Sequence, residues 1–306
     1  MTDAAPETAI RKPDWLRKPP GSATETLAVK KLLRQTRLTT VCEEARCPNI
    51  ADCFSRGTAT FMILGDICTR GCRFCAVTTG KPRFAQENFA REAEGVAEAA
   101  ATLGLKHVVV TSVARDDLKD GGASGFVATI RELRHRLPQS SVEVLIPDLR
   151  GNVEALVQIF TETPDVLNHN LETVPRLYKK VRPGAIYKQS LELLRHAAEF
   201  VPTDANGSST NRMLVKTGIM LGLGESPDEV EQLMNDAFEH GARMFTAGQY
   251  LQPSKKHLPV TSYISDGEFQ EYETMATRIG FHHVAVGPLV RSSYHADESF
   301  EVSSFR

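Results

Sequence analysis

Three observations predict an α/β fold for this chain of 306 residues, with a parallel sheet covered by helices. Short apolar runs recur from Ala59 onward, helical stretches separate them, and no run alternates like a half-exposed strand. Strands and helices in regular succession are typical of parallel sheets. Two architectures fit this order: a doubly wound sheet, and a barrel with some of its βα units missing.

Six short apolar runs are the predicted strands. They lie at residues 59–64, 107–112, 142–147, 165–170, 213–221 and 243–250. The predicted helices lie between and around them, at 24–36, 88–103, 124–137, 152–160, 187–199, 226–239 and about 266–279. A capping box opens each of the last two helices, at Ser226 with Glu229 and at Ser265 with Glu268.

The composition excludes several classes of function. The net charge of −2 and the pI of about 6.5 give no electrostatic footprint for nucleic acid. No apolar run approaches the roughly 20 residues of a membrane span, and the arm at 1–22 lacks the apolar core of a secretory signal. We therefore expect a cytoplasmic protein with no nucleic-acid or membrane partner. The polar stretch at 203–212 is predicted to be an exposed insertion, and the sequence assigns it no function.

All six cysteines fall within one short window and form two sets of three. The first cysteine set, spaced Cys-x4-Cys-x5-Cys, consists of Cys42, Cys47 and Cys53. The second cysteine set, spaced Cys-x3-Cys-x2-Cys, consists of Cys68, Cys72 and Cys75. In a reducing compartment a disulfide framework is not expected. Sets of three rather than pairs therefore predict two iron–sulfur clusters, each without a fourth cysteine.

The second cysteine set follows a predicted strand, where a site loop belongs in a βα series. Three thiolates on one loop hold three irons of a 4Fe–4S cluster and leave the fourth iron open to a small chelating molecule. A zinc site is the alternative, but these gaps are atypical for zinc. The motif, with Phe74 before its last cysteine, resembles the radical S-adenosylmethionine (radical SAM) superfamily. The resemblance implies that SAM chelates the open iron and is cleaved to a 5′-deoxyadenosyl radical.

The first cysteine set and the motif Arg291-Ser292-Ser293-Tyr294 together resemble the lipoyl synthase family. The resemblance extends over nearly the whole chain and includes the segments 65–77, 111–123, 169–174, 181–185 and 218–225. It implies an auxiliary 4Fe–4S cluster held by the first cysteine set, with Ser293 as the ligand of the fourth iron. It also implies catalytic roles for Ser293 and for the second cysteine set.

The resemblance selects the barrel among the two architectures. It implies a partial (β/α)6 TIM-type barrel whose open mouth is covered by N- and C-terminal extensions. The expected division is an N-terminal extension at 1–58, the barrel at 59–280 and a C-terminal extension at 281–306.

Five polar residues near predicted strand ends are candidate SAM contacts. By resemblance to related enzymes, Thr111 and Ser112 face the methionyl amine, and Asn170 and Glu172 face the ribose hydroxyls. Arg182 would pair its guanidinium with the SAM carboxylate. The alternatives are a turn and helix cap for Asn170 and Glu172, and a surface ion pair for Arg182. Asp116 and Asp117 follow the same predicted strand as Thr111 and Ser112 and lie on the same predicted face. They are equally well explained as caps of the next helix.

The resemblance implies sulfur insertion at the sixth and eighth carbons of an octanoyl chain bound to a carrier lysine. The auxiliary cluster is the sulfur donor. The implied partners are octanoylated lipoyl domains of 2-oxoacid dehydrogenase acyltransferase subunits, the glycine-cleavage H protein, a reductant such as ferredoxin or flavodoxin, and an iron–sulfur carrier. Competing hypotheses are a methylthiotransferase-like enzyme, biotin synthase and a non-enzymatic metal-binding scaffold.

Overall fold

The computed structural model describes residues 11–13, 16, 23–36, 38–55, 59–201 and 213–293. Most of the predicted arm at 1–22, the predicted insertion at 203–212 and the chain from residue 294 onward lie outside these residues. Within them, no helix is both long and apolar enough to cross a membrane.

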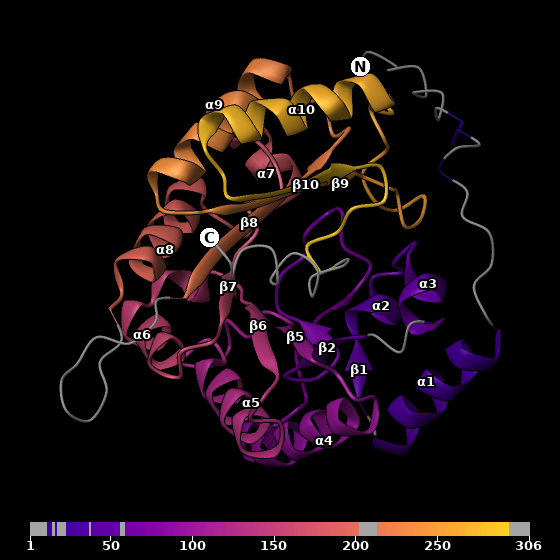
Figure 1. The fold of residues 1–306 in the computed structure, drawn as a ribbon, viewed down its shortest axis with the longest axis vertical. Coiled ribbons are helices and arrows are strands. Elements are labelled where there is room, and N and C mark those ends of the chain that lie inside the picture. Colours follow the sequence, from indigo (N-terminus) through magenta and orange to yellow (C-terminus); the bar gives the residue numbers. More distant parts are fainter. Residues whose placement is uncertain are drawn as a thin grey trace.

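An open sheet of eight strands organises the described part of the chain (Figure 1). Its spatial order follows the sequence, through β1 (Thr39–Thr40), β2 (Thr60–Ile63), β5 (His107–Ser112), β6 (Ser141–Leu145), β7 (Val166–Asn168), β8 (Leu214–Leu221), β9 (Met244–Gln249) and β10 (His283–Gly287). Neighbouring strands are parallel except β1 and β2. Because this order never reverses, and β1 and β10 are the two edges of the described sheet, the fold is a partial barrel rather than a doubly wound sheet.

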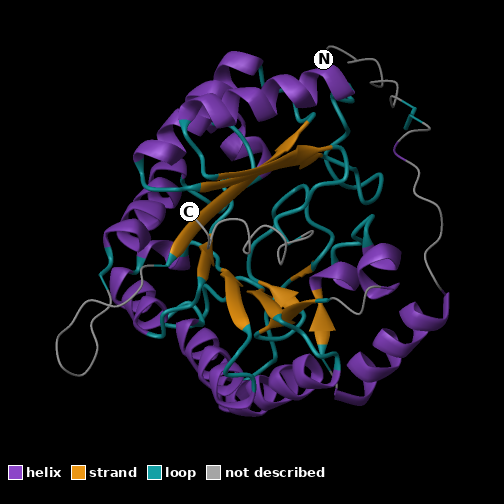
Figure 2. Cartoon of the chain, viewed as in Figure 1, coloured by secondary structure: helices purple, strands orange, loops and turns teal. Residues whose placement is uncertain are grey.

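Helices cover the outer side of the sheet (Figure 2). The longer ones are α1 (Ala23–Thr36), α4 (Phe89–Thr102), α5 (Ala123–Arg136), α6 (Val153–Thr161), α8 (Tyr187–Glu199), α9 (Pro227–Glu239) and α10 (Asp266–Ile279). Shorter helices are α2 (Val41–Glu44), α3 (Ile50–Ser55) and α7 (Tyr178–Val181), with 3₁₀ turns at Gln86–Asn88, Leu149–Gly151 and Pro175–Leu177. The six predicted strands and seven predicted helices are confirmed to within one or two residues at their ends, and so are both capping boxes.

Two strands of the sheet were not predicted. β1 has only two residues, too few for any periodicity, and it pairs antiparallel with β2. β10 lies in the segment assigned to the C-terminal extension and pairs parallel with β9, so that extension begins by adding a strand to the barrel. Its residues are only half-buried, which gives a weaker apolar signal than the six predicted runs.

A buried ion pair lies inside the barrel. Lys216 Nζ of β8 is 3.0 and 3.2 Å from the carboxylate oxygens of Glu143 of β6, and Asn168 donates a hydrogen bond to the same carboxylate at 3.0 Å. Burial alone would raise the pKa of Glu143, but Lys216 and His107 more than offset it and hold the pKa at about 2. The glutamate is therefore ionised, and each partner depends on the other for charge compensation.

Replacing Lys216 with Met is expected to lower the free energy of unfolding by about 3–5 kcal/mol, because Glu143 then keeps a buried charge that lacks its ammonium partner. Urea unfolding of the iron-free protein measures this loss. The double variant Lys216→Met/Glu143→Leu removes both charges and should regain most of the lost stability. A single variant as stable as the double variant would show that the pair is unimportant.

Candidate functional site

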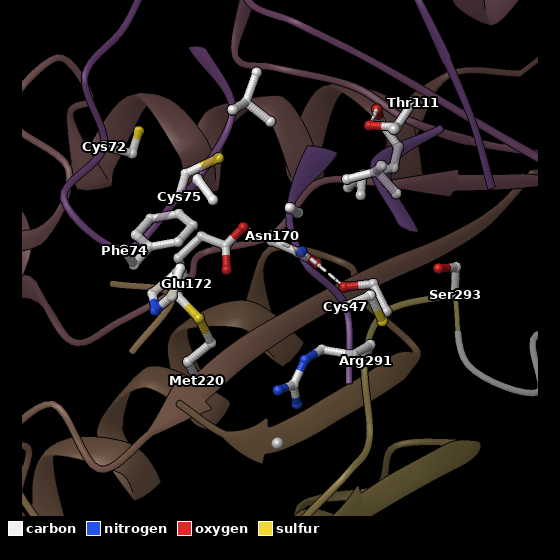
Figure 3. A pocket seen from close by; sticks show the side chains of 18 of the residues that line it. Cys47, Cys72, Phe74, Cys75, Thr111, Asn170, Glu172, Met220, Arg291 and Ser293 are labelled. Carbon is white, nitrogen blue, oxygen red and sulfur yellow. Dashed lines mark hydrogen bonds between the residues drawn. The ribbon is translucent and has the colours of Figure 1, made fainter. Parts of the chain in front are cut away.

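A cavity of about 550 Å³ lies inside the barrel, and side chains from both cysteine sets form its wall (Figure 3). Five of the six cysteines line it, namely Cys42, Cys47, Cys68, Cys72 and Cys75. The predicted SAM contacts and the predicted serine ligand line it too, namely Thr111, Ser112, Asn170, Glu172, Arg182 and Ser293. Figure 3 shows Cys72 and Cys75 on one side of the cavity and Cys47 with Ser293 on the other. The structure thus gathers residues from distant parts of the chain around one space.

The second cysteine set lies on a loop after β2 that is fixed by its own small ribbon. Strand β3 (Ile67–Cys68) pairs with β4 (Thr78–Thr79), and the Cys68 sulfur lies 3.4 and 3.3 Å from the backbone N–H groups of Arg70 and Ala114. Burial raises the pKa of the Cys75 thiol to about 12 and also raises that of Cys72. Thiolates here need a positive partner in the cavity, and the irons of a cluster supply one.

A buried arginine between the cysteines ties this loop to the barrel. Arg70 makes two hydrogen bonds of 2.8 Å to Asp116, after β5, and lies 2.6 Å from Asp148, after β6. Asp148 is fully buried, and although burial would raise its pKa, Arg70 more than offsets this and lowers it. The sequence reasoning missed this network, although an arginine inside the motif and aspartates after two strands were visible signals.

The suggested cap role of Asp116 and Asp117 is wrong. Helix α5 begins only at Ala123, and the first backbone N–H groups there are accepted by Asp120, not by the earlier aspartates. Asp117 instead pairs with Arg115 at 2.9 Å.

The turn that leads from β2 into the cysteine loop is held by a glutamate. The carboxylate of Glu92, from α4, accepts the backbone N–H groups of Leu64 at 2.7 Å and Gly65 at 3.3 Å. Leu64 has a φ of +70°, an uncommon conformation for a branched side chain, so this turn needs such support. Burial raises the pKa of Glu92 to about 7, although the two N–H groups lower it in part.

The raised pKa of Glu92 predicts a pH-dependent stability. The folded carboxyl binds its proton more tightly than the unfolded one, so this stabilisation is complete below the unfolded pKa, near 4.5, and is lost as the pH rises through about 7. We expect the unfolding free energy to fall by roughly 2–3 kcal/mol between about pH 5 and pH 8 relative to Glu92→Gln, which does not titrate. Urea unfolding of both iron-free proteins across this range is the measurement, and parallel curves would contradict the prediction.

Among the described residues, two of the predicted SAM contacts carry buried polar atoms that find no partner. These are the Ser112 hydroxyl and the Nε of Arg182, and both side chains line the cavity. Nη1 of Arg182 donates to the backbone oxygens of Asn170 and Leu171, at 3.0 and 3.2 Å, and the side chain is buried, so this residue is not in a surface ion pair. Thr111 donates its hydroxyl to Leu145 O. Unsatisfied buried atoms cost free energy, and a polar ligand such as SAM would satisfy them.

Asn170 and Glu172 are part of a connection to the C-terminal segment, not a helix cap. The next helical turn is capped by no side chain. The Asn170 amide exchanges two hydrogen bonds with the Ser292 hydroxyl, of 2.7 and 2.9 Å, and donates to Glu172 at 3.2 Å. Glu172 has a φ of +66°, its backbone pairs with β8, and burial raises its carboxyl pKa. The cap alternative is therefore wrong, whereas the predicted contact with the ribose stays a prediction.

The first cysteine set lies on the two short helices that follow β1. Cys42 is in α2, Cys53 is in α3, and Cys47 lies between them, with its N–H bonded to Cys42 O at 3.0 Å. Cys53 is not in the cavity wall, but it is close enough to Cys42 to raise the pKa of that thiol. Burial is the larger cause and takes the Cys42 pKa to about 12. No disulfide joins any of the six cysteines, all of which the structure describes.

The C-terminal segment 288–293 crosses from the edge strand β10 towards β2, next to the other edge of the sheet. Asn49 donates to Leu289 O at 2.7 Å, and Thr60 donates to the Ser293 hydroxyl at 2.8 Å. A Cβ on Gly248 would lie 2.0 Å from Val290 O, so only glycine permits this path. The segment thereby brings Ser293 to the first cysteine set.

Comparison with known proteins shows similarity at two levels, to the radical SAM superfamily and to lipoyl synthases. The model of the radical SAM superfamily matches residues 62–237. A lipoyl synthase of Methylococcus capsulatus is 55% identical over 96% of this chain and 88% of its own length. Lipoyl synthases of Shewanella oneidensis and Aeromonas salmonicida are 52% and 50% identical over 95% of this chain, and over 88% and 86% of their own lengths.

Solved structures support the fold. The hydrogenase maturase HydG matches with a TM-score of 0.53 and 14% identity, over 85% of this chain and 62% of its own. Coproporphyrinogen III oxidase from Escherichia coli, a radical SAM enzyme, matches with a TM-score of 0.50 and 14% identity, over 72% of this chain and 52% of its own. At such low identity these matches concern the architecture alone.

Proposed function

The chain belongs to the lipoyl synthase family of radical SAM enzymes, and we propose that it inserts two sulfur atoms into a protein-bound octanoyl chain. The sulfur atoms go to the sixth and eighth carbons of an octanoyl-lysine and give the lipoyl group. One observation carries the proposal: five of the six cysteines, from both sets, and Ser293 line a single cavity. A reaction that joins a radical to a sulfur donor requires the two to share one closed space.

The second cysteine set is proposed to hold the cluster that binds SAM. Cys68, Cys72 and Cys75 supply three thiolates, and Ser112 and Arg182 offer the polar atoms that lack a partner. A 4Fe–4S cluster held by these cysteines would supply the one-electron chemistry that cleaves SAM to a 5′-deoxyadenosyl radical. The protein's task is to orient the substrate and exclude water, which the apolar side chains Ile146, Ile219 and Met220 of the cavity wall support.

The first cysteine set and Ser293 are proposed to hold the auxiliary cluster as the sulfur donor. Serine oxygen is a poorer ligand for iron than thiolate, which suits an iron that must be released when sulfur is given up. The contact of Ser293 with Thr60, beside Cys42, supports its place in this ligand set.

The proposed partners follow from this reaction. The substrates are octanoylated lipoyl domains of 2-oxoacid dehydrogenase acyltransferase subunits and the glycine-cleavage H protein. A ferredoxin or flavodoxin supplies electrons, and an iron–sulfur carrier rebuilds the consumed cluster. The thiolate ligands call for a reducing compartment such as the cytoplasm.

Anaerobic reconstitution followed by turnover tests the proposal. We expect about eight irons and eight sulfides per chain, as two 4Fe–4S clusters require. An octanoylated carrier peptide should then gain two sulfur atoms, with release of 5′-deoxyadenosine. A single cluster would contradict the proposal, and two clusters without sulfur insertion would favour a scaffold or another two-cluster radical SAM enzyme.

Replacing Ser293 with Ala is expected to lower sulfur insertion by about 100-fold or more, because the auxiliary cluster loses a ligand. SAM cleavage should stay within about threefold of wild type, because it depends on the second cysteine set. Mass spectrometry of the peptide and chromatography of 5′-deoxyadenosine measure the two separately. Ser292→Ala, at the neighbouring serine bonded to Asn170, should have a smaller effect on sulfur insertion. Loss of SAM cleavage alone in Ser293→Ala would rule out the ligand role.

A further inference from the structure

The buried hydroxyl of Thr60 contacts both Ser293 and Cys42 of the first cysteine set, which are far apart in the sequence. Thr60 is the first residue of β2 and is only 5% exposed. Its hydroxyl donates to Ser293 Oγ at 2.8 Å, across 233 residues of sequence. Its backbone and side chain also bond to the Cys42 thiol.

We propose that Thr60 is a positioning residue that holds Ser293 against the auxiliary cluster. This inference rests on the proposed function, because it takes Ser293 as an iron ligand. The Thr60 hydroxyl lies 2.8 Å from Ser293 Oγ. A serine oxygen bound to iron has no proton to donate, so the one proton of Thr60 would go to it. The serine oxygen therefore accepts from Thr60 and keeps a lone pair for iron.

The chemistry of the bond explains why a hydroxyl is used at this place. An iron-bound serine oxygen carries negative charge, and a hydrogen bond to a charged acceptor is about twice as strong as one between neutral groups. Partners that hydrogen-bond to metal ligands orient them, and their loss typically costs 10–100-fold in metal affinity. Strand β2 belongs to the sheet of the barrel, whereas Ser293 lies on the segment that follows the edge strand β10. Thr60 therefore fixes a ligand on a terminal segment to the barrel.

The contacts that hold the C-terminal segment 288–293 agree with this role of Thr60. Asn49 holds Leu289, and Asn170 holds Ser292, so the path of the backbone is set before residue 293. Neither contact reaches the Ser293 side chain. Among the described residues, Thr60 is the one that hydrogen-bonds to the Ser293 side chain, so Thr60 is the residue to test.

The test is a double-mutant cycle on the rate at which a chelator removes iron from the reconstituted protein. The four proteins are wild type, Thr60→Val, Ser293→Ala and the double variant. We expect Thr60→Val to speed iron loss by about 10-fold. In the Ser293→Ala background the same substitution should have a much smaller effect, due only to the contact of Thr60 with Cys42, because Thr60 acts mainly through Ser293. Thr60→Ser keeps the donor and should restore the wild-type rate to within about threefold.

Multiplicative effects in the double variant would overturn the inference, since Thr60 would then act independently of Ser293. A wild-type rate in Thr60→Val, or a Thr60→Ser as defective as Thr60→Val, would overturn it as well. Urea unfolding of the iron-free proteins checks the packing of valine, and Thr60→Ala removes the same donor if valine disturbs the fold. Failure of the proposed function is visible separately, as a missing second cluster in the wild-type protein before any variant is compared.

Discussion

Replacing Cys72 with Ala is expected to reduce SAM cleavage below about one thousandth of the wild-type rate, whereas Cys47→Ala should keep it within about threefold. Both variants should lose sulfur insertion. The reason is the separation of the two cysteine sets on opposite sides of the cavity. Cys72 belongs to the set that would bind SAM, and Cys47 belongs to the set that would donate sulfur. Chromatography of 5′-deoxyadenosine and mass spectrometry of the octanoylated peptide report the two steps.

The other members of each set provide the control for this comparison. Cys75→Ala should behave like Cys72→Ala, and Cys42→Ala should behave like Cys47→Ala. Each variant should also lose about half of the reconstituted iron, since one of two clusters is removed. A Cys47→Ala protein that no longer cleaves SAM would show that the two sets do not work separately.

The sequence predicted those parts of the fold whose signal is local. Strands such as 107–112 are continuous apolar runs, and α9 and α10 begin at capping boxes, so their places could be inferred without the structure. Strands β1 and β10 were not predicted, because β1 has only two residues and most residues of β10 are only half-buried. The buried pair of Glu143 and Lys216 was partly predictable, because a charged residue inside a predicted buried strand requires a partner. Which residues pair could not be predicted, because the pairing depends on how close β6 and β8 lie in the fold.

The same difference applies to the site. The cysteines of each set are only a few residues apart, so the sequence alone predicted that each set holds an iron–sulfur cluster. The contacts that place the cysteine loop join distant segments, such as Arg70 with Asp148, and no local pattern shows which of these residues pair. The Asn170–Ser292 contact likewise spans 122 residues. Long-range polar contacts of this kind follow from the way the open sheet curves into a partial barrel.

Replacing Arg70 with Met is expected to lower the free energy of unfolding by about 3–5 kcal/mol. Asp148 is fully buried, and without the guanidinium it keeps an uncompensated charge. The Asp116 carboxylate loses both hydrogen bonds from the Arg70 guanidinium. We also expect SAM cleavage to fall by about 100-fold, because the loop that carries the second cysteine set loses its contact with Asp148 after β6 and keeps only its Thr69 and Cys68 contacts at the end of β5. Urea unfolding of the iron-free protein and the rate of 5′-deoxyadenosine release measure the two effects.

An exposed arginine provides the matched control. Arg176 pairs with Glu229 through two hydrogen bonds of 2.7 and 2.8 Å, but its side chain is 57% exposed. Arg176→Met should therefore have little effect on the free energy of unfolding and leave SAM cleavage unchanged. Arg70→Lys keeps the charge but cannot reproduce the fork that reaches both aspartates, so it should fall between wild type and Arg70→Met. If Arg70→Met were no more harmful than Arg176→Met, the cysteine loop would have to be positioned by its β3–β4 ribbon and the backbone contacts of Cys68 alone.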